Sequence, residues 1–273
     1  MNTGVRDEYV LLNDLRFHYR DWGDASAPPL VVLHGFTGHA RSWDSFAAAM
    51  AGKYRVLCLD QRGHGDSDWT EDYSTPAMVG DIAAFVSALR LESYDLLGLS
   101  MGGSNAIHFA GSNPPGLARL VIVDIGPETQ SSGSARIASG VQASDTFDTP
   151  EEAIAAGRRG NARADEHELQ HRVRNNLLRT EDGKWTYRYD RRLRDASRPR
   201  RRPNTDENWA AWKRIDVPTL LIRGSESDIL GKPTAEKMVE TNAHCQMLEV
   251  QGSGHSIPLE APRGFLEAVR TFL

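Results

Sequence analysis

The chain has 273 residues and a formal net charge of −5 at pH 7, and 40% of its residues are hydrophobic and 25% charged. These values suit one globular domain with room for an inserted subdomain, and the negative charge argues against a general attraction to nucleic acids or anionic membranes. The first nine residues lack the apolar core of a signal peptide, and no apolar run approaches the roughly 20 residues that span a bilayer.

Apolar runs typical of strands alternate with helical patterns along most of the chain. The predicted strands are, in chain order, Tyr9–Leu12, Arg16–Trp22, Leu30–His34, Tyr54–Asp60, Tyr94–Leu99, Leu117–Asp124, Thr219–Arg223 and Gln246–Val250. The predicted helices lie near Ser42–Ala51, Pro76–Leu91, Met101–Gly111, Thr234–Thr241 and Pro262–Phe272. The inner runs are apolar without alternation, which is typical of strands buried on both faces. The first two runs predict an antiparallel edge hairpin. The pattern therefore predicts an α/β fold with a mainly parallel sheet between helix layers.

The alternation of strands and helices stops after Pro127 and resumes at Val217. Residues 128–214 contain 18 Lys and Arg against 14 Asp and Glu, whereas the remainder contains 14 against 23. We therefore expect this segment to be a mostly helical cap inserted after the sixth strand. The core would then consist of residues 1–127 and 215–273.

A Gly-x-Ser-x-Gly motif, Gly98-Leu99-Ser100-Met101-Gly102, lies between a predicted strand and a predicted helix. This is the context of a nucleophile elbow, in which the serine hydroxyl stands above the edge of the sheet. Gly98 and Gly102 leave room for strand and helix to approach, and the helix start directs a backbone N–H toward the reacting oxygen. The motif predicts Ser100 as a nucleophile.

Two further segments contain the groups that a serine nucleophile needs. His34-Gly35-Phe36-Thr37-Gly38 follows a predicted strand, where such a fold supplies an oxyanion donor. The backbone N–H groups of Phe36 and Met101 are therefore candidates for an oxyanion hole. His255 follows a Gly-rich loop after the last predicted strand and is the candidate general base.

The carboxylate that would orient His255 has two main candidates, each at the end of a predicted strand. Asp124 follows Leu117–Val123, and Asp228 follows Thr219–Arg223. Either could accept the second ring N–H of the histidine and fix its tautomer. Glu226 is a third candidate.

Several features of the chain resemble the α/β-hydrolase superfamily, and the match extends over the whole chain outside the cap. They are Ser100, His255, the His34-Gly35 loop and the turn Asp60-Gln61-Arg62-Gly63-His64-Gly65. In the commoner pattern of that family the acid lies three residues after a glycine beyond the cap, a position that Ser227 occupies here. A smaller subgroup has a serine there and takes its acid from the strand after the nucleophile helix. It includes small bacterial esterases and 2-(acetamidomethylene)succinate hydrolase, and Val-Asp-Ile-Gly-Pro at 123–127 resembles it. The resemblance thus implies Asp124 as the acid and Asp228 as the alternative.

The expected activity is hydrolysis of a small carboxylic ester or lactone through an acyl-enzyme. Ser100 would attack, His255 would take its proton, and Asp124 would orient the histidine. The same groups would serve in hydrolysis of a C–C bond or an amide, or in a ligand-binding signalling protein with slow turnover, because the fold alone does not determine the substrate.

Aromatic residues are candidates for the wall of the substrate pocket, although such residues more often form a cap's own core. They are Trp43, Trp185, Tyr187, Tyr189, Trp209 and Trp212. Arginines of the cap could bind a substrate carboxylate, although a surface position is more typical of each. They are Arg136, Arg158, Arg172 and Arg179.

No phosphate-binding loop occurs, and Cys58 and Cys245 have no nearby cluster of metal ligands, so we expect neither a cofactor nor a metal. The arginines of Ser197–Pro203, namely Arg198, Arg200, Arg201 and Arg202, are interpreted as a solvated loop and not as a nucleic-acid site. We expect a small-molecule substrate, no membrane partner, reduced thiols and a cytoplasmic location, with both monomer and homodimer open.

Overall fold

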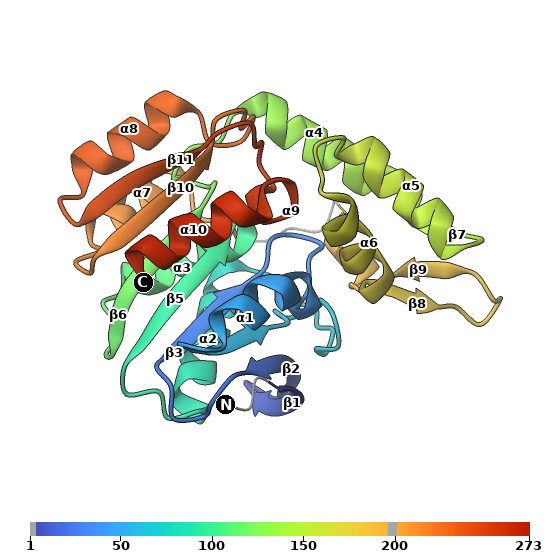
Figure 1. Cartoon of the computed structure of the whole chain (residues 1–273), viewed down its shortest axis with the longest axis horizontal. Coiled ribbons are helices and arrows are strands. Elements are labelled where there is room, and N and C mark those ends of the chain that lie inside the picture. Colours follow the sequence, from blue (N-terminus) through green and yellow to red (C-terminus); the bar gives the residue numbers. More distant parts are fainter. Residues whose placement is uncertain (1–3, 196–200) are drawn as a thin grey trace.

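The computed structural model describes residues 4–195 and 201–273, which contain an eight-stranded sheet of order β1-β2-β4-β3-β5-β6-β10-β11 (Figure 1). The strands are β1 (Val5–Leu12), β2 (Leu15–Trp22), β3 (Pro29–Leu33), β4 (Arg55–Leu59), β5 (Tyr94–Leu99), β6 (Leu117–Val123), β10 (Thr219–Gly224) and β11 (Cys245–Val250). β2 is antiparallel to both of its neighbours, and all other neighbours are parallel. The expected α/β fold with a mostly parallel sheet is confirmed.

β1 and β2 form the expected edge hairpin, in which Leu12 pairs with Leu15. The two residues between them, Asn13 and Asp14, have φ angles of 50° and 64°. Two successive residues with positive φ suit a tight hairpin turn whose twist matches that of the strands, and Asn and Asp tolerate this conformation well.

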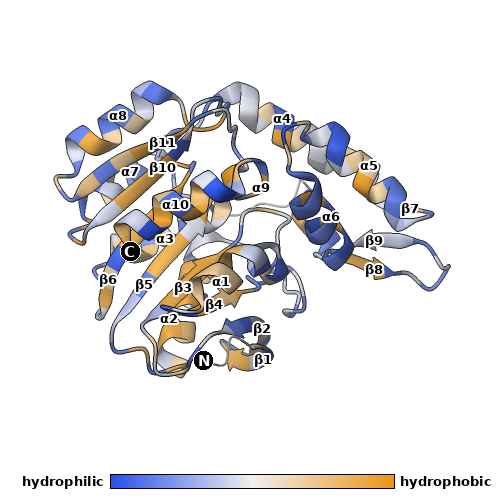
Figure 2. Ribbon diagram, viewed as in Figure 1, coloured by the Kyte–Doolittle hydropathy of each residue, from blue (hydrophilic) through white to orange (hydrophobic). Residues whose placement is uncertain are grey.

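Helices cover both faces of the sheet (Figure 1). They are α1 (Asp44–Met50), α2 (Thr75–Ala88), α3 (Met101–Ala110), α8 (Lys232–Thr241), α9 (Ile257–Glu260) and α10 (Pro262–Phe272), with the 3-10 helix η1 (Ala40–Trp43) before α1. Along β3, Val31 and Leu33 join the hydrophobic cluster with α2, α3 and α8, whereas Leu30 and Val32 join the cluster with α1 and α10. Both faces of the strand are therefore apolar, as the hydropathy colouring shows (Figure 2).

Residues 128–214 follow β6, and most of their elements extend to one side of the sheet, whereas the last helix lies beside the main domain (Figure 1). They comprise α4 (Ser131–Gln142), β7 (Thr146–Phe147), α5 (Pro150–Gly160), α6 (Glu166–Asn175), β8 (Leu177–Arg179), β9 (Trp185–Tyr187), η2 (Arg191–Arg194) and α7 (Thr205–Lys213). The three strands form a small antiparallel sheet of order β7-β9-β8, which the sequence pattern did not predict. Strands of two or three residues are too short to show an alternating pattern.

The last helix of this segment, α7, packs against α3 of the main domain. Trp209 and Trp212 lie in the hydrophobic cluster of that face, and Trp212 is 0% exposed. The indole N–H of Trp212 donates to the backbone oxygen of Met238 in α8. In its packing, α7 is therefore part of the main core.

Cys58 and Cys245 are both buried free thiols. None of the described helices has both the length and the apolar character needed to cross a membrane. Of the four arginines singled out in Ser197–Pro203, Arg198 and Arg200 fall outside the described residues, and Arg201 and Arg202 are exposed.

Candidate active site

Ser100 occupies the sharp turn between β5 and α3, with φ 53° and ψ −114°. A non-glycine residue with such a backbone is strained, and the flanking glycines allow the turn to form. A Cβ atom on Gly98 would lie 2.4 Å from the backbone oxygen of Gly102, and one on Gly102 would lie 2.7 Å from that of His34. The close approach of strand, helix and the loop after β3 thus requires glycine at both positions.

His255 links Ser100 to a buried aspartate. Its Nε2 lies 2.9 Å from Ser100 Oγ, and its Nδ1 lies 2.9 Å from Asp124 Oδ2. With Nδ1 protonated, the ring donates to Asp124 and its Nε2 accepts from the Ser100 hydroxyl. The three side chains come from the ends of β5, β6 and β11, whose carboxyl ends share one edge of the parallel sheet.

Asp124 directly follows β6, has a φ of 50° and is 0% exposed. Its Oδ1 accepts the backbone N–H of Gly224 at 2.9 Å, and its Oδ2 accepts the Ser227 hydroxyl at 2.5 Å in addition to His255. Three donors surround this carboxylate, as the burial of an ionised carboxylate requires.

The structure does not bring Asp228 to His255. Its two carboxylate oxygens accept from Nε and a terminal nitrogen of Arg136 at 2.6 Å and 2.8 Å. This hydrogen-bonded ion pair lowers the pKa of Asp228. Glu226 is exposed and has no hydrogen bond to His255. Of the three candidates, only Asp124 contacts the histidine.

Phe36 and Met101 lie on either side of Ser100, one in the loop after β3 and the other at the first position of α3. Within residues 4–195 and 201–273, neither backbone N–H has a hydrogen-bond acceptor. A Cβ atom on Gly35 would lie 3.3 Å from the Cβ of Ser100, so the loop approaches the serine closely. Two unpaired N–H groups beside a serine hydroxyl are the arrangement that can hold an oxyanion.

His34 orders this loop. Its Nδ1 donates to the backbone oxygen of Gly35 at 2.8 Å, and its Nε2 accepts the backbone N–H of Gln61 at 3.0 Å. Both contacts require the neutral ring with its proton on Nδ1. Burial lowers the pKa of His34 to about 3, and the charge of His64 acts in the same direction.

A cavity of about 30 Å³ is lined in part by residues next to Ser100 and His255 in the chain. Its wall includes Gly35, Leu99 and Ser256, the chain neighbours of Phe36, Ser100 and His255. The other lining residues are His34, Gly38, Ser42, Trp43, Glu168, Arg172, Pro258 and Leu259. This volume is close to that of one water molecule, so a bound ester requires part of the wall to move. Glu168 and Arg172 have the longest flexible side chains of that wall.

Among the aromatic candidates, Trp43 lines this cavity, but Trp209 and Trp212 do not. The expectation that these two line the pocket is corrected, because α7 directs them into the main core. Trp185 packs in the separate hydrophobic cluster around α5 and α6. Tyr187 and Tyr189 stack with ring centroids 6.0 Å apart and belong to a cluster that includes the side chains of Phe36 and Met101.

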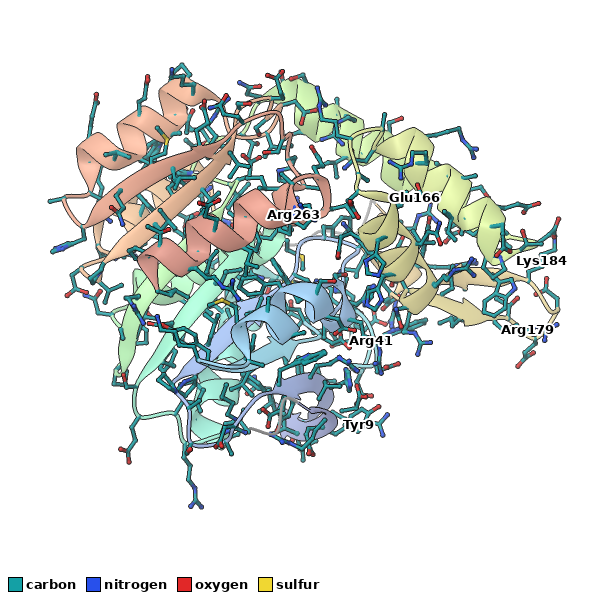
Figure 3. The ribbon with its side chains drawn as sticks, viewed as in Figure 1. Tyr9, Arg41, Glu166, Arg179, Lys184 and Arg263 are labelled. Carbon is teal, nitrogen blue, oxygen red and sulfur yellow. The ribbon has the colours of Figure 1, made fainter. Side chains whose placement is uncertain are left out.

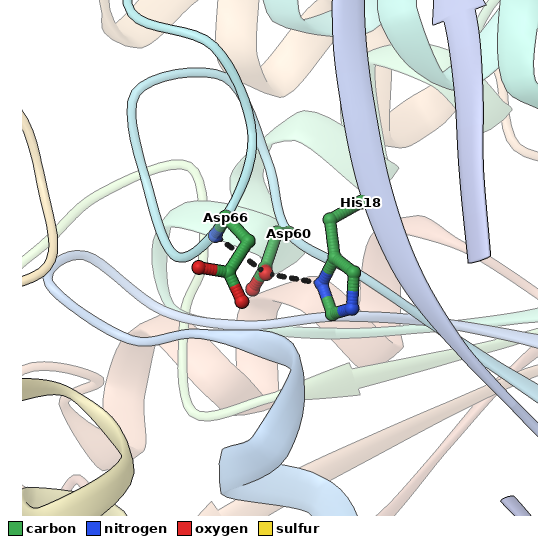
Figure 4. Close-up of side chains that lie close together, drawn as sticks. All are labelled: His18, Asp60 and Asp66. Atoms are coloured by element: carbon green, nitrogen blue, oxygen red, sulfur yellow. Dashed lines mark hydrogen bonds and ion pairs between the residues drawn. The ribbon is translucent and has the colours of Figure 1, made fainter. Parts of the chain in front are cut away.

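Two groups of side chains among the described residues could offer ligands to a metal ion. They are His18, Asp60 and Asp66, shown in Figure 4, and the partly exposed group Asp165, His167 and Glu168. In the first group, His18 Nδ1 lies 2.7 Å from Asp60 Oδ2, and Asp60 also accepts the backbone N–H groups of Ala40 and Asp66.

This first group is better explained as a structural network than as a metal site. Burial by itself raises the pKa of Asp60, but the hydrogen bond and charge of His18 lower it to about 2. His18 is held from its other side by Asp7, 2.9 Å from Nε2. Because Asp60 Oδ1 binds the N–H of Ala40 at 2.5 Å, the network fixes the end of the oxyanion loop. The turn at Asp60–Gly65 was noticed in the sequence as part of the family resemblance. Its residues did not reveal the hydrogen bond between Asp60 and the backbone N–H of Ala40.

Comparison with known proteins agrees with this fold. The model of the alpha/beta hydrolase family matches residues 30–268, and the chain belongs to that family. It is 31% identical to the 3-hydroxybutyrate-oligomer hydrolase of Cupriavidus necator, over 88% of this chain and 87% of that one. It is 27% identical to an esterase of Mycobacterium tuberculosis, over 92% and 84% of the two chains.

Among solved structures, the chain resembles E-2-(acetamidomethylene)succinate hydrolase with a TM-score of 0.89 over 98% of this chain and 99% of that one. At 20% identity this similarity concerns the fold alone. The relatives of the chain are hydrolases and esterases, which supports ester hydrolysis as its general class of reaction.

Proposed function

We propose that the protein hydrolyses small carboxylic esters or lactones through an acyl-enzyme. The observation that carries the proposal is the continuous hydrogen-bond path from Ser100 Oγ through His255 to Asp124, with both distances to the ring at 2.9 Å. A path of this kind lets the histidine take the proton of the serine as the serine attacks.

In the first half of the reaction, Ser100 Oγ bonds to the carbonyl carbon while its proton passes to His255 Nε2. The N–H groups of Phe36 and Met101 bind the oxygen on which negative charge develops. His255 then gives its proton to the leaving alcohol, and the acyl group remains on Ser100. In the second half, His255 takes a proton from water as the water oxygen attacks the acyl carbon. The bond from that carbon to Ser100 Oγ then breaks, His255 returns the proton to Oγ, and the carboxylic acid leaves. Asp124 stabilises the charged ring in both halves.

We further propose that residues 128–214 act as a cap that completes the substrate pocket. Glu168 and Arg172 of α6 lie in the cavity wall opposite residues contributed by the main domain. α6 is attached to the oxyanion loop, since Asn176 after the helix donates to the Thr37 backbone oxygen at 3.0 Å and His39 Nε2 donates to that of Arg172 at 3.0 Å. The cap helix is thus held close to the reacting groups.

The test is steady-state hydrolysis of short 4-nitrophenyl esters and small lactones by the wild type and by Ser100→Ala. We expect turnover by the wild type and a loss of about 10³-fold or more in the variant. Rapid quenching followed by intact-protein mass spectrometry should detect an acyl adduct on the wild type only. Equal rates for the two proteins, or absence of turnover by the wild type, would contradict the proposal.

A further inference from the structure

Arg172 differs from most of the other arginines of residues 128–214 in where its side chain lies and in what it contacts. It lies on α6, is only partly exposed and lines the same cavity as Leu99 and Ser256, the chain neighbours of Ser100 and His255. Across the described parts of the chain, its guanidinium makes no hydrogen bond and no ion pair. Burial lowers the pKa of Arg172, and the opposing influence comes from Tyr187 and not from a carboxylate.

Other arginines of this segment have carboxylate partners. Those partners are Asp228 for Arg136, Glu166 for Arg158, Glu151 for Arg174, Asp66 for Arg188 and Asp190 for Arg192. Arg179 is exposed at the β8–β9 hairpin, where it donates to the Gly183 backbone oxygen (Figure 3). Arg159 and Arg163 also lack a carboxylate partner among the described residues, but both are exposed to water, whereas Arg172 lines the cavity.

The backbone of Arg172 is held in place even though its side chain is unpaired. Its carbonyl accepts from His39 Nε2, and His171, its neighbour in α6, lies 3.0 Å from an oxygen of Asp44. These contacts join α6 to the segment that follows the oxyanion loop. The position of the Arg172 backbone relative to the oxyanion loop is therefore constrained, and the side chain forms part of the cavity wall.

A guanidinium removed from water without a partner is costly, and a planar fork of N–H groups matches a carboxylate best. Glu168, one helical turn earlier, lines the same cavity but forms no ion pair with Arg172. The missing acceptor can therefore be provided by a bound molecule.

We propose that Arg172 binds a carboxylate of the substrate, so that the preferred ester carries a free carboxylate in its acyl half or in its alcohol half. This inference rests on the proposed ester hydrolysis and names its substrate class. Arg172 would act as a specificity-determining residue, since it reaches a part of the substrate other than the scissile bond.

The test compares matched esters in two arms. In the acyl arm, 4-nitrophenyl hydrogen succinate is compared with 4-nitrophenyl butanoate. In the alcohol arm, 3-acetoxypropanoate is compared with butyl acetate. For the wild type we expect kcat/KM to favour the anionic ester in one arm. In Arg172→Gln, the ratio of anionic to neutral kcat/KM in that arm should fall by about tenfold or more, the usual effect of losing a charged hydrogen bond.

Arg172→Lys keeps the charge but loses the fork and should give an intermediate ratio, while the exposed control Arg179→Gln should keep the wild-type ratio. A wild-type ratio in Arg172→Gln in both arms would overturn the inference, as would a wild type with no preference for the anionic ester in either arm.

A binding measurement separates this inference from the proposed function. Monomethyl succinate, with its carboxylate in the acyl half, and 3-acetoxypropanoate, with its carboxylate in the alcohol half, are each titrated calorimetrically into Ser100→Ala and into Ser100→Ala/Arg172→Gln. Binding that is about tenfold weaker in the double variant supports Arg172 as a carboxylate site, even if the wild type hydrolyses none of the four esters. The site would be overturned if neither ester binds Ser100→Ala more tightly than it binds the double variant. Lack of hydrolysis alone would overturn only the proposed function.

Discussion

The hydroxyl of Ser227 donates to Asp124 at an Oγ–Oδ2 distance of 2.5 Å, and His255 contacts the same carboxylate oxygen. The same hydroxyl accepts the backbone N–H groups of Ile229 and Leu230. Ser227 lies at the position where the resemblance to the commoner pattern of the family would put the acid, and here its hydroxyl binds the carboxylate proposed as the acid.

Asp124→Asn should lower kcat by about 10³ to 10⁴-fold, because an amide cannot stabilise the charged His255 ring and favours the wrong tautomer. Asp228→Asn removes one partner of a partly exposed ion pair with Arg136 and should leave kcat near that of the wild type. Steady-state kinetics on one short ester, with circular dichroism to verify folding, distinguishes the two. A large loss of kcat only in Asp228→Asn would refute the assignment of Asp124.

Ser227→Ala should lower kcat by about tenfold, since Asp124 loses one of its three donors and orients His255 less firmly. A more demanding experiment moves the carboxylate from position 124, after β6, to position 227, after β10. Ser227→Asp in the Asp124→Asn background should recover at least part of the lost kcat, because its carboxylate starts from a position in contact with residue 124. If the double variant folds and is no more active than Asp124→Asn alone, a carboxylate at position 227 cannot take over the role proposed for Asp124.

Gly98→Ala should destabilise the fold severely. The added Cβ would lie 2.4 Å from the Gly102 backbone oxygen, a contact that requires the backbone itself to move. Gly80→Ala in α2 is the matched control, because nothing lies within 4 Å of its added Cβ. Urea unfolding should show a large loss for the first variant, and a gain of about 0.5–1 kcal/mol for the second from its better helix propensity. Similar unfolding midpoints for both would contradict the tight turn.

Trp212→Ala should lower the free energy of unfolding by about 3–5 kcal/mol, because it leaves a cavity in the main core and removes the hydrogen bond to Met238. The KM for a short ester should stay close to that of the wild type, since Trp212 does not line the cavity. Parallel measurements of unfolding and kinetics test this. A rise in KM with little loss of stability would restore Trp212 to the pocket wall.

The stability of the protein should fall on acidification from about pH 6.5 to pH 4. Burial lowers the pKa of His34 to about 3 and that of His39 to about 4, so the unfolded chain binds protons in this range before the folded protein does. Each such group adds a slope of up to about 1.4 kcal/mol per pH unit. His39→Gln keeps a donor for the Arg172 carbonyl and should make the slope shallower.

Above pH 6.5 the sign reverses for His18. Burial lowers the pKa of this residue, but the hydrogen bond and charge of Asp60 raise it above the usual value, so its contribution to stability is lost as the pH rises. Urea unfolding at intervals between pH 4 and pH 9 provides the measurement. An unchanged slope in His39→Gln below pH 6.5 would show that His39 is not buried in its neutral form.

The sequence by itself determined the class of fold, and it predicted Ser100 and His255 as nucleophile and base. The strand runs of an inner parallel sheet are continuous and apolar because both faces are buried, and a Gly-x-Ser-x-Gly turn between strand and helix depends on local backbone geometry. These signals need no distant contact to be recognised. The same reasoning placed His255 in a Gly-rich loop at the carboxyl end of a strand.

Only the tertiary structure decided which carboxylate reaches the histidine. Asp124 follows β6 and Asp228 follows β10, and these two strands are parallel neighbours in the sheet. The sequence pattern therefore places both carboxylates beyond the carboxyl ends of adjacent strands and does not choose between them. Asp124 turns toward His255 with donors from Gly224 and Ser227, whereas Arg136 of α4 takes the carboxylate of Asp228. The sequence also did not show that Trp212 lies in the core or that Arg172 lines the cavity. Which side of a helix faces the core or the cavity depends on how that helix packs. Composition and spacing do not contain that orientation, because it arises from contacts between segments far apart in the chain.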